Sequence, residues 1–301
     1  MGALIDINTN GFAKLVELVF NVTGLSASGA KKNTDAKIYD MFETAKAEIE
    51  INRMKQNSAN PLERFVATKE LRKMNNILQV SEKAVHEFVE NEQVSSEVVY
   101  PDWSARFFNI IEDVSDDEMQ NLWAKILAGE IKHPKSFSLR TLDVLRNLSK
   151  EEAETFMRNA PYSIDGSYLC AENNFISISD YLLLVDAGLI NSEELAIDFT
   201  PSDEGVFDLV TGNRVIRIKG DKDRIKRMGL KIYTYTRAGK ELLKLTTFQS
   251  SKNLLEYIVT IFKQMDAEKI TEHLVIEVNG EPYNIDNDPL KVYLDNSSLC
   301  S

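Results

Sequence analysis

The residue types that carry most enzyme chemistry are scattered in this chain. Three histidines, His86, His133 and His273, lie far apart, without the spacing of metal ligands around them. The sequence contains no glycine-rich phosphate loop, no Gly-x-Ser-x-Gly nucleophile motif and no His-Glu-x-x-His zinc motif. We therefore predict a non-enzymatic protein with no catalytic residues, no bound metal and no cofactor. An enzyme of a type without a known motif is the weaker alternative.

One acidic cluster, Asp113 with Asp116, Asp117 and Glu118, has the right chemistry for a cation. A Mg²⁺ site generally needs carboxylates that converge from separate elements, whereas these residues are neighbours in the sequence. Ser115 and Glu118 have the spacing of a capping box, and carboxylates at a helix N-terminus are stabilised by the helix dipole. We expect these side chains to cap a helix.

A basic run is the strongest candidate for a binding surface. Between Arg214 and Arg237 the chain has nine Lys or Arg and two Asp, a local charge of +7 in a chain with a net charge of −12. The candidate anion- or partner-binding residues are Arg214, Arg217, Lys219, Lys222, Arg224, Lys226, Arg227 and Lys231. Such a run is either a solvated surface or a surface that faces nucleic acid or an acidic partner protein. Arg106 and Arg140 are weaker candidates, because pairing with a nearby carboxylate is the commoner fate of such side chains.

The basic run belongs to a segment of helices followed by strands. Hydrophobic spacing predicts helices over 138–148, 150–160 and 180–189, a hairpin of strands 214–219 and 230–236, and a helix over 237–245. This order, with Ala187-Gly-Leu-Ile190 before the hairpin and Thr236-Arg-Ala-Gly-Lys-Glu-Leu-Leu243 after it, resembles bacterial winged-helix domains. The resemblance implies either DNA reading or protein docking.

The third of these helices favours protein docking. Its sequence, Ser179 to Gly188, has two aspartates and no Lys or Arg, so it would repel a phosphate backbone. We predict an interaction or sensing protein that docks a protein partner through this domain. A DNA-binding regulator that holds phosphates with the basic hairpin is the alternative.

The N-terminal region predicts helices with apolar faces. Residues 12–22 form a short, strongly apolar helix, which packs in the core or on another subunit, lies at a membrane surface, or docks as a mobile arm. The membrane alternative is disfavoured because Lys and Arg do not flank the helix, which is also too short to span a bilayer.

Two long polar helices follow, with a break at Pro61, and each carries an apolar seam with heptad spacing. The candidate oligomer-seam residues are Ile38, Phe42, Ile49, Leu71, Met74 and Leu78. An exposed seam needs a partner, so we predict a homo-oligomer, most simply a two-fold dimer.

Residues 101–142 include the strings Asp113-Val-Ser-Asp-Asp-Glu-Met-Gln-Asn-Leu-Trp-Ala-Lys-Ile-Leu-Ala-Gly-Glu130 and Pro134-Lys-Ser-Phe-Ser-Leu-Arg-Thr-Leu142. They resemble a family of uncharacterised bacterial proteins, and the resemblance implies kinship without an activity. Trp103 and Trp123 each lie on the apolar stripe of a helix, which predicts two core anchors, and Gly129 is expected to end the second helix.

The C-terminal sequence predicts a helix over 251–265 and a hairpin over 274–285 that turns at Asn279-Gly280. Together these elements are expected to form a small appendage. The predicted fold is mainly α with a small β component (α+β), divided into 1–95, 96–135, 136–248 and 249–301. A hydrophobic fraction of 43% is that of a globular protein. Two distant cysteines and a start without a basic signal region predict a cytoplasmic protein.

Overall fold

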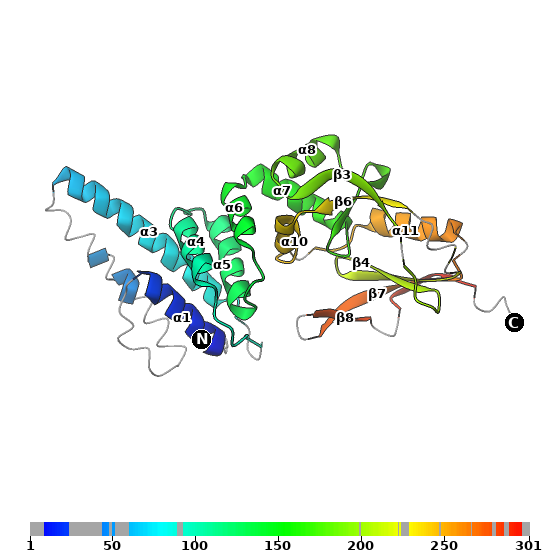
Figure 1. Ribbon diagram of the computed structural model, residues 1–301, viewed down its shortest axis with the longest axis horizontal. Helices are drawn as coiled ribbons and strands as arrows, with labels where there is room; N and C mark the ends of the chain where they lie inside the picture. The colour runs from blue at the N-terminus through cyan, green and yellow to red at the C-terminus, as the bar shows by residue number, and fades with distance from the viewer. Residues whose placement is uncertain are drawn as a thin grey trace, which may run out of the picture. The chain divides into compact units, whose positions relative to one another are not determined.

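The computed structural model describes residues 9–23, 44–47, 50–51, 60–88, 93–198, 200–221, 223, 229–246, 248–265, 267–278, 281–285 and 289–296. The chain forms two compact units, Met1–Leu142 (unit 1) and Asp143–Ser301 (unit 2). The predicted class, a mainly α protein with a small β component, is confirmed (Figure 1). In the described part of the chain, no helix has the length and apolar character needed to cross a membrane.

Unit 1 is helical in its described part. Its elements are α1 (Thr9–Thr23), α3 (Pro61–Val85), α4 (Pro101–Ile111), α5 (Asp117–Lys132) and the start of α6 (Leu139–Asn147). Helices α3 and α5 pack along each other, and α1 contacts both of them and α4. Phe12, Leu15 and Val19 of α1 are buried in these contacts, which is the core alternative among those considered for residues 12–22.

Both tryptophans are core residues, as predicted. Trp103 stacks on Phe107 with ring centroids 4.9 Å apart, and Trp123 meets Phe107 edge-on at 5.6 Å. The Trp103 indole Nε1 donates a hydrogen bond to the Phe137 carbonyl oxygen at 2.8 Å. This bond satisfies the polar atom of a buried aromatic side chain.

Two details of α5 correct the sequence predictions. The N-cap is Asp116, whose side chain accepts a hydrogen bond from the Met119 amide, and Ser115 precedes it. Gly129 does not end the helix, which continues to Lys132. A Cβ at Gly129 would lie 2.8 Å from the Phe137 ring, so glycine is needed there for close packing, not for termination.

Unit 2 combines helices with two antiparallel sheets. The helices are the rest of α6, α7 (Lys150–Asn159), α8 (Ile178–Asp186), α10 (Arg237–Leu243) and α11 (Lys252–Gln264), with single 3₁₀ turns at Ala160–Tyr162 and Glu172–Asn174. The first sheet has the order β1 (Ser163–Ile164), β2 (Tyr168–Cys170), β6 (Leu230–Tyr235), β3 (Ile190–Ile197). The second has the order β4 (Val206–Thr211), β5 (Arg214–Lys219), β7 (Lys269–Val278), β8 (Glu281–Ile285), and β9 (Lys291–Asp295) also pairs with β7.

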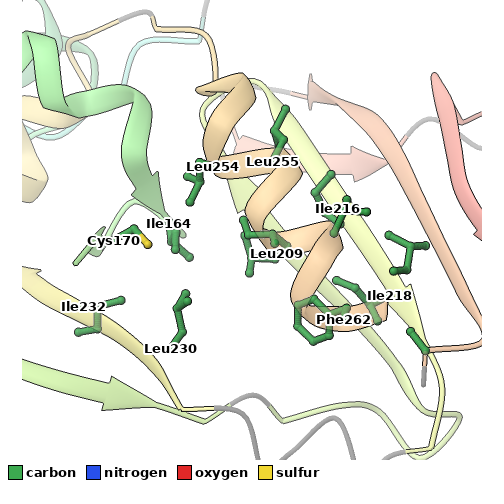
Figure 2. Packing of buried hydrophobic residues seen from close by; sticks show 14 residues of the cluster. Ile164, Cys170, Leu209, Ile216, Ile218, Leu230, Ile232, Leu254, Leu255 and Phe262 are labelled. Carbon is green, nitrogen blue, oxygen red and sulfur yellow. The ribbon is translucent and has the colours of Figure 1, made fainter. Parts of the chain in front are cut away.

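Helix α11 contributes one side of a core that both sheets share. Figure 2 shows Leu254 and Phe262 of α11 among apolar side chains of the strands, including Ile216 of β5 and Ile232 of β6. Strand β7 is hydrogen-bonded to β5 along its first half. The predicted C-terminal appendage, with a boundary at 248/249, is therefore wrong, because α11 and β7 are parts of the core of unit 2. The predicted pairing of β7 with β8 is confirmed, and Asn279-Gly280 lies outside the described residues.

The predicted hairpin of strands 214–219 and 230–236 is also wrong. Strand β5 pairs with β4 and β7, whereas β6 pairs with β2 and β3 in the other sheet. The physical reason is that β5 has a nearer partner. Gly212, with a φ of 52°, and Asn213 form a two-residue turn that joins β4 directly to β5.

Candidate protein-docking face

The described residues of the basic run are mostly paired with carboxylates of the same unit. Arg217 on β5 donates to both oxygens of Asp208 on β4 at 2.8 Å. The Arg214 Nε lies 3.1 Å from Glu272 on β7, and the Lys231 Nζ lies 3.2 Å from Glu194 on β3.

The other candidates of the basic run are exposed or lie outside the described residues. Lys219 is exposed at the end of β5. Lys222, Arg224, Lys226 and Arg227 lie outside the described residues. Three of the four described candidates are thus ion-paired across strands, which reduces the charge that they offer to an external anion.

The candidate seam residues do not form an exposed stripe in the described part of the chain. Leu78 is buried inside unit 1, and Leu71 and Met74 are half-buried. Ile38, Phe42 and Ile49 lie outside the described residues. The seam at Leu78 is therefore corrected to a core position. The first turns of α3 expose other apolar side chains, Leu62, Phe65 and Val66.

The histidine and arginine residues considered for chemistry lie at different places in the fold. His273 is buried on β7, where its Nε2 lies 2.8 Å from the Thr271 hydroxyl. Arg106 and Arg140 are exposed. Within the described ranges, no group of three or more His, Cys, Asp or Glu side chains is placed to hold a metal ion.

Helix α8 places apolar side chains in solvent. Ile178 is 79% exposed and Leu182 is 54% exposed, and residues four apart lie on the same face of a helix. Of the helix's residues only Leu184 is fully buried. Because large apolar side chains next to each other on a surface mark interaction sites, this stripe is a candidate docking surface.

Contacts on both sides of this stripe hold α8 in place. The Asp180 carboxylate accepts hydrogen bonds from Arg158 and Asn159 of α7, and the Arg158 guanidinium lowers the pKa of Asp180. The Tyr181 ring packs on Tyr233 of β6, with centroids 4.6 Å apart. The Tyr181 hydroxyl donates to the Ser192 carbonyl oxygen of β3 at 2.9 Å. The helix is thereby fixed to α7 and to the first sheet.

Strand β3 is the edge of that sheet and has an unusual exposure. In the order β1-β2-β6-β3, no described strand pairs with its outer side. Six successive residues, 191–196, are exposed, so both faces of the strand are open over this length. An exposed edge strand presents backbone groups that can pair with another chain.

The charge of this region is of one sign. Residues 177–198, which make α8 and β3, contain five acidic residues and no Lys or Arg. They are Asp180, Asp186, Glu193, Glu194 and Asp198. We use the name α8–β3 face for the exposed surface of Ile178, Leu182, Asp186 and Glu194, which is apolar and acidic.

Helix α8 and its acidic character are predictable from the sequence, whereas β3 is not. Residues 190–197 (Ile-Asn-Ser-Glu-Glu-Leu-Ala-Ile) lack a period-two pattern, because a strand exposed on both faces needs no apolar side. The exposure of Ile178 was also not predicted, since an apolar residue at helical spacing is usually buried.

The fold and its exposed face define a mixed α+β protein with a helical unit and a two-sheet unit. The family model described as "Protein of unknown function (DUF2806)" matches residues 61–168 and 163–259, and the chain belongs to this family. No curated protein and no solved structure matches the chain.

Proposed function

We propose that this protein is a non-enzymatic interaction protein that docks a protein partner through the α8–β3 face. The observation that carries the proposal is the exposed pair Ile178 and Leu182 on a helix held by Asp180 and Tyr181. A rigid apolar stripe with a polar rim has the composition of a protein interface.

The charges support a protein partner over nucleic acid. Two of the five carboxylates of residues 177–198 are ion-paired, Asp180 with Arg158 and Glu194 with Lys231, and the other three would repel phosphates. Arg214 and Arg217 are themselves paired with carboxylates of unit 2. In this proposal unit 2 is a winged-helix-like domain in which α8 takes the place of the recognition helix. The antiparallel pairing of β3 with β6 immediately after α8 supports that assignment.

Self-association is part of the proposal, on a surface different from the predicted seam. Leu62, Phe65 and Val66 are exposed on the first turns of α3, and Glu63 and Lys69 flank them. Antiparallel packing of two such helices places the Glu63 of one chain near the Lys69 of the other. A cytoplasmic location is also proposed, supported by the free thiol of the buried Cys170.

A photoreactive amino acid placed in the chain tests the docking surface directly. At Leu182 we expect a covalent adduct with one protein of the native cell. At Val292, which is 50% exposed on β9, we expect no such adduct. Equal labelling at the two positions, or adducts with nucleic acid at Leu182, would contradict protein docking through α8.

A further inference from the structure

We propose that β3 accepts an extended segment of the partner as an added antiparallel or parallel strand, and that this segment alternates Lys or Arg with apolar residues. The inference rests on the proposed docking function and names its binding mode and the partner's chemistry. We base it on three observations: the free edge of β3, the register of β3 on β6, and the negative charge of residues 177–198.

The edge has room for a short strand. Residues 191–196 of β3 are exposed, so no described helix or loop buries the side chains of this stretch. The Ser192 carbonyl oxygen already accepts the Tyr181 hydroxyl. Pairing with a new strand is therefore open from Glu194 to Ile197, the part of β3 in regular register with β6, and such a length is within the range of strands in proteins.

The register gives the two faces of β3 different chemistry. Leu195 pairs with Ile232, and Ile197 pairs with Leu230, whose side chains are both in the core of unit 2. An incoming apolar residue beside Leu195 would extend this core, because cross-strand neighbours lie on the same face of a sheet.

The opposite face of the strand is acidic. Glu194 pairs with Tyr233, and the Tyr233 ring contacts Tyr181, so Glu194 is on the face that carries α8. Lys231, two residues along β6, reaches Glu194 from the same face in an exposed ion pair. Arg158 pairs with Asp180 and Lys231 with Glu194, and the other acidic residues of 177–198 are Asp186, Glu193 and Asp198. These three carboxylates leave negative charge near the edge that a Lys or Arg of an added strand would neutralise. Because faces alternate along a strand, the preferred ligand alternates basic and apolar residues.

A second copy of β3 is a poor occupant of this edge. Pairing two β3 strands would bring Glu193 and Glu194 of one chain next to the same residues of the other. Like charges in directly opposed positions destabilise a strand pair. A basic partner segment relieves that repulsion, and charge complementarity therefore selects it.

The test uses the full chain and labelled peptides as long as the eight-residue β3. The first peptide alternates Lys with Val, and the second has the same composition with its lysines and valines in separate blocks. Anisotropy titrations at physiological salt are expected to show binding of the alternating peptide about tenfold tighter or more, a difference of about 1.4 kcal/mol. Equal affinity would mean attraction to an acidic protein without strand addition and would overturn the inference.

Backbone methylation separates strand addition from side-chain binding. Two further alternating peptides carry N-methyl groups on odd or on even residues, so that each loses the hydrogen-bond donors of one edge. Because only one edge of the peptide faces β3, we expect one of them to lose binding and the other to keep it. If both N-methylated peptides bind, or if neither binds, pairing along one edge of the peptide is contradicted.

Variants of the chain locate the site. Leu195→Lys changes a side chain that is 43% exposed and should weaken the alternating peptide about tenfold without unfolding the protein. Val292→Lys on β9 is the matched control and should bind as the wild type does. Weakened binding by Val292→Lys, with wild-type binding by Leu195→Lys, would place the site on the other sheet and overturn the inference.

The outcomes for the two proposals are separable. If Leu182 cross-links a protein but the alternating and block peptides bind equally, docking through α8 stands and strand addition fails. If the peptide results are as expected but Leu182 gives no adduct, β3 is a strand acceptor and docking through α8 fails.

Discussion

The Tyr181 hydroxyl donates a hydrogen bond to the Ser192 carbonyl oxygen at 2.9 Å, and this bond ties α8 to the edge strand β3. The same ring packs on Tyr233 of the neighbouring strand β6. One side chain thus joins the helix with exposed apolar residues to the strand with an open edge. The two parts of the α8–β3 face are therefore held in a fixed relation to each other.

Replacing Trp123 by alanine should cost about 3–5 kcal/mol of the free energy of unfolding, the usual range for truncation of a buried aromatic residue. Trp123 is fully buried and packs edge-on against Phe107. Urea unfolding followed by circular dichroism measures the loss. Lys125→Ala, at an exposed position of the same helix, should leave the midpoint nearly unchanged. A Trp123→Ala transition identical to that of the wild type would show that Trp123 is a surface contact.

Glu130 is a buried residue whose role is to hold the loop that follows α5. Its two carboxylate oxygens accept hydrogen bonds from the Lys135 amide at 2.6 Å and from the Phe137 amide at 2.9 Å. Glu130→Gln offers one acceptor oxygen for two amides, so it should destabilise unit 1 by about 1–3 kcal/mol. The effect is measured by comparing the melting temperature of Glu130→Gln with that of Glu118→Gln, a control at an exposed position of the same helix. Equal melts for the two variants would refute the bridging role.

Two variants of α3 should behave differently in solution. Phe65→Glu places a charge at an exposed position and should convert a dimer to a monomer of 34.1 kDa without loss of fold. Leu78→Glu places a charge in the core and should unfold unit 1, because burial of an unpaired charge is costly. Light scattering and circular dichroism measure both effects. A wild type that is monomeric at micromolar concentration would rule out self-association.

The thiol of Cys170 should be unreactive in the folded protein. Burial raises its pKa to about 11, so little of the reactive thiolate is present at pH 8. In a Cys300→Ser background, a thiol reagent should label the native chain slowly and the urea-unfolded chain at once. Because the folded pKa lies above the unfolded value of about 8.5, the stability contribution of this group is full below that pH and declines as pH rises toward 11. Rapid labelling of the folded chain at pH 8 would contradict its burial.

Local signals in the sequence predicted several elements correctly. The spacing of Ser149 and Glu152 is a capping-box signal for the start of α7, and the capping box is present with both of its hydrogen bonds. The apolar spacing around Trp123 predicted a buried helix face. These features depend on residues a few positions apart, so a single sequence contains the information.

Two turn signals in the sequence indicate hairpins that hydrophobic spacing alone does not reveal. Asp165 and Gly166 both have positive φ in the turn between β1 and β2, and Asp-Gly is a strong hairpin signal. The Gly212-Asn213 turn similarly predicts the hairpin of β4 and β5.

Other features depend on pairing between distant segments. Strand β6 joins β2 and β3, and β5 joins β7, so no local pattern shows which strands share a sheet. The central place of α11 in the core of unit 2 has the same origin. For the proposed docking face, the acidic character of α8 is visible in the sequence, whereas the open edge of β3 follows only from the sheet order.

The central claim, protein docking through the α8–β3 face, is tested most directly by a quantitative pull-down from native extract, with and without nuclease treatment. The bait chains are the wild type, the double variant Ile178→Asp/Leu182→Asp, and the control Val98→Asp/Val292→Asp, whose positions are 76% and 50% exposed. We predict a protein that the wild type and the control retain equally and the α8 variant loses, with no effect of nuclease. Equal retention by the α8 variant, or loss of the bound protein after nuclease treatment, would contradict the account.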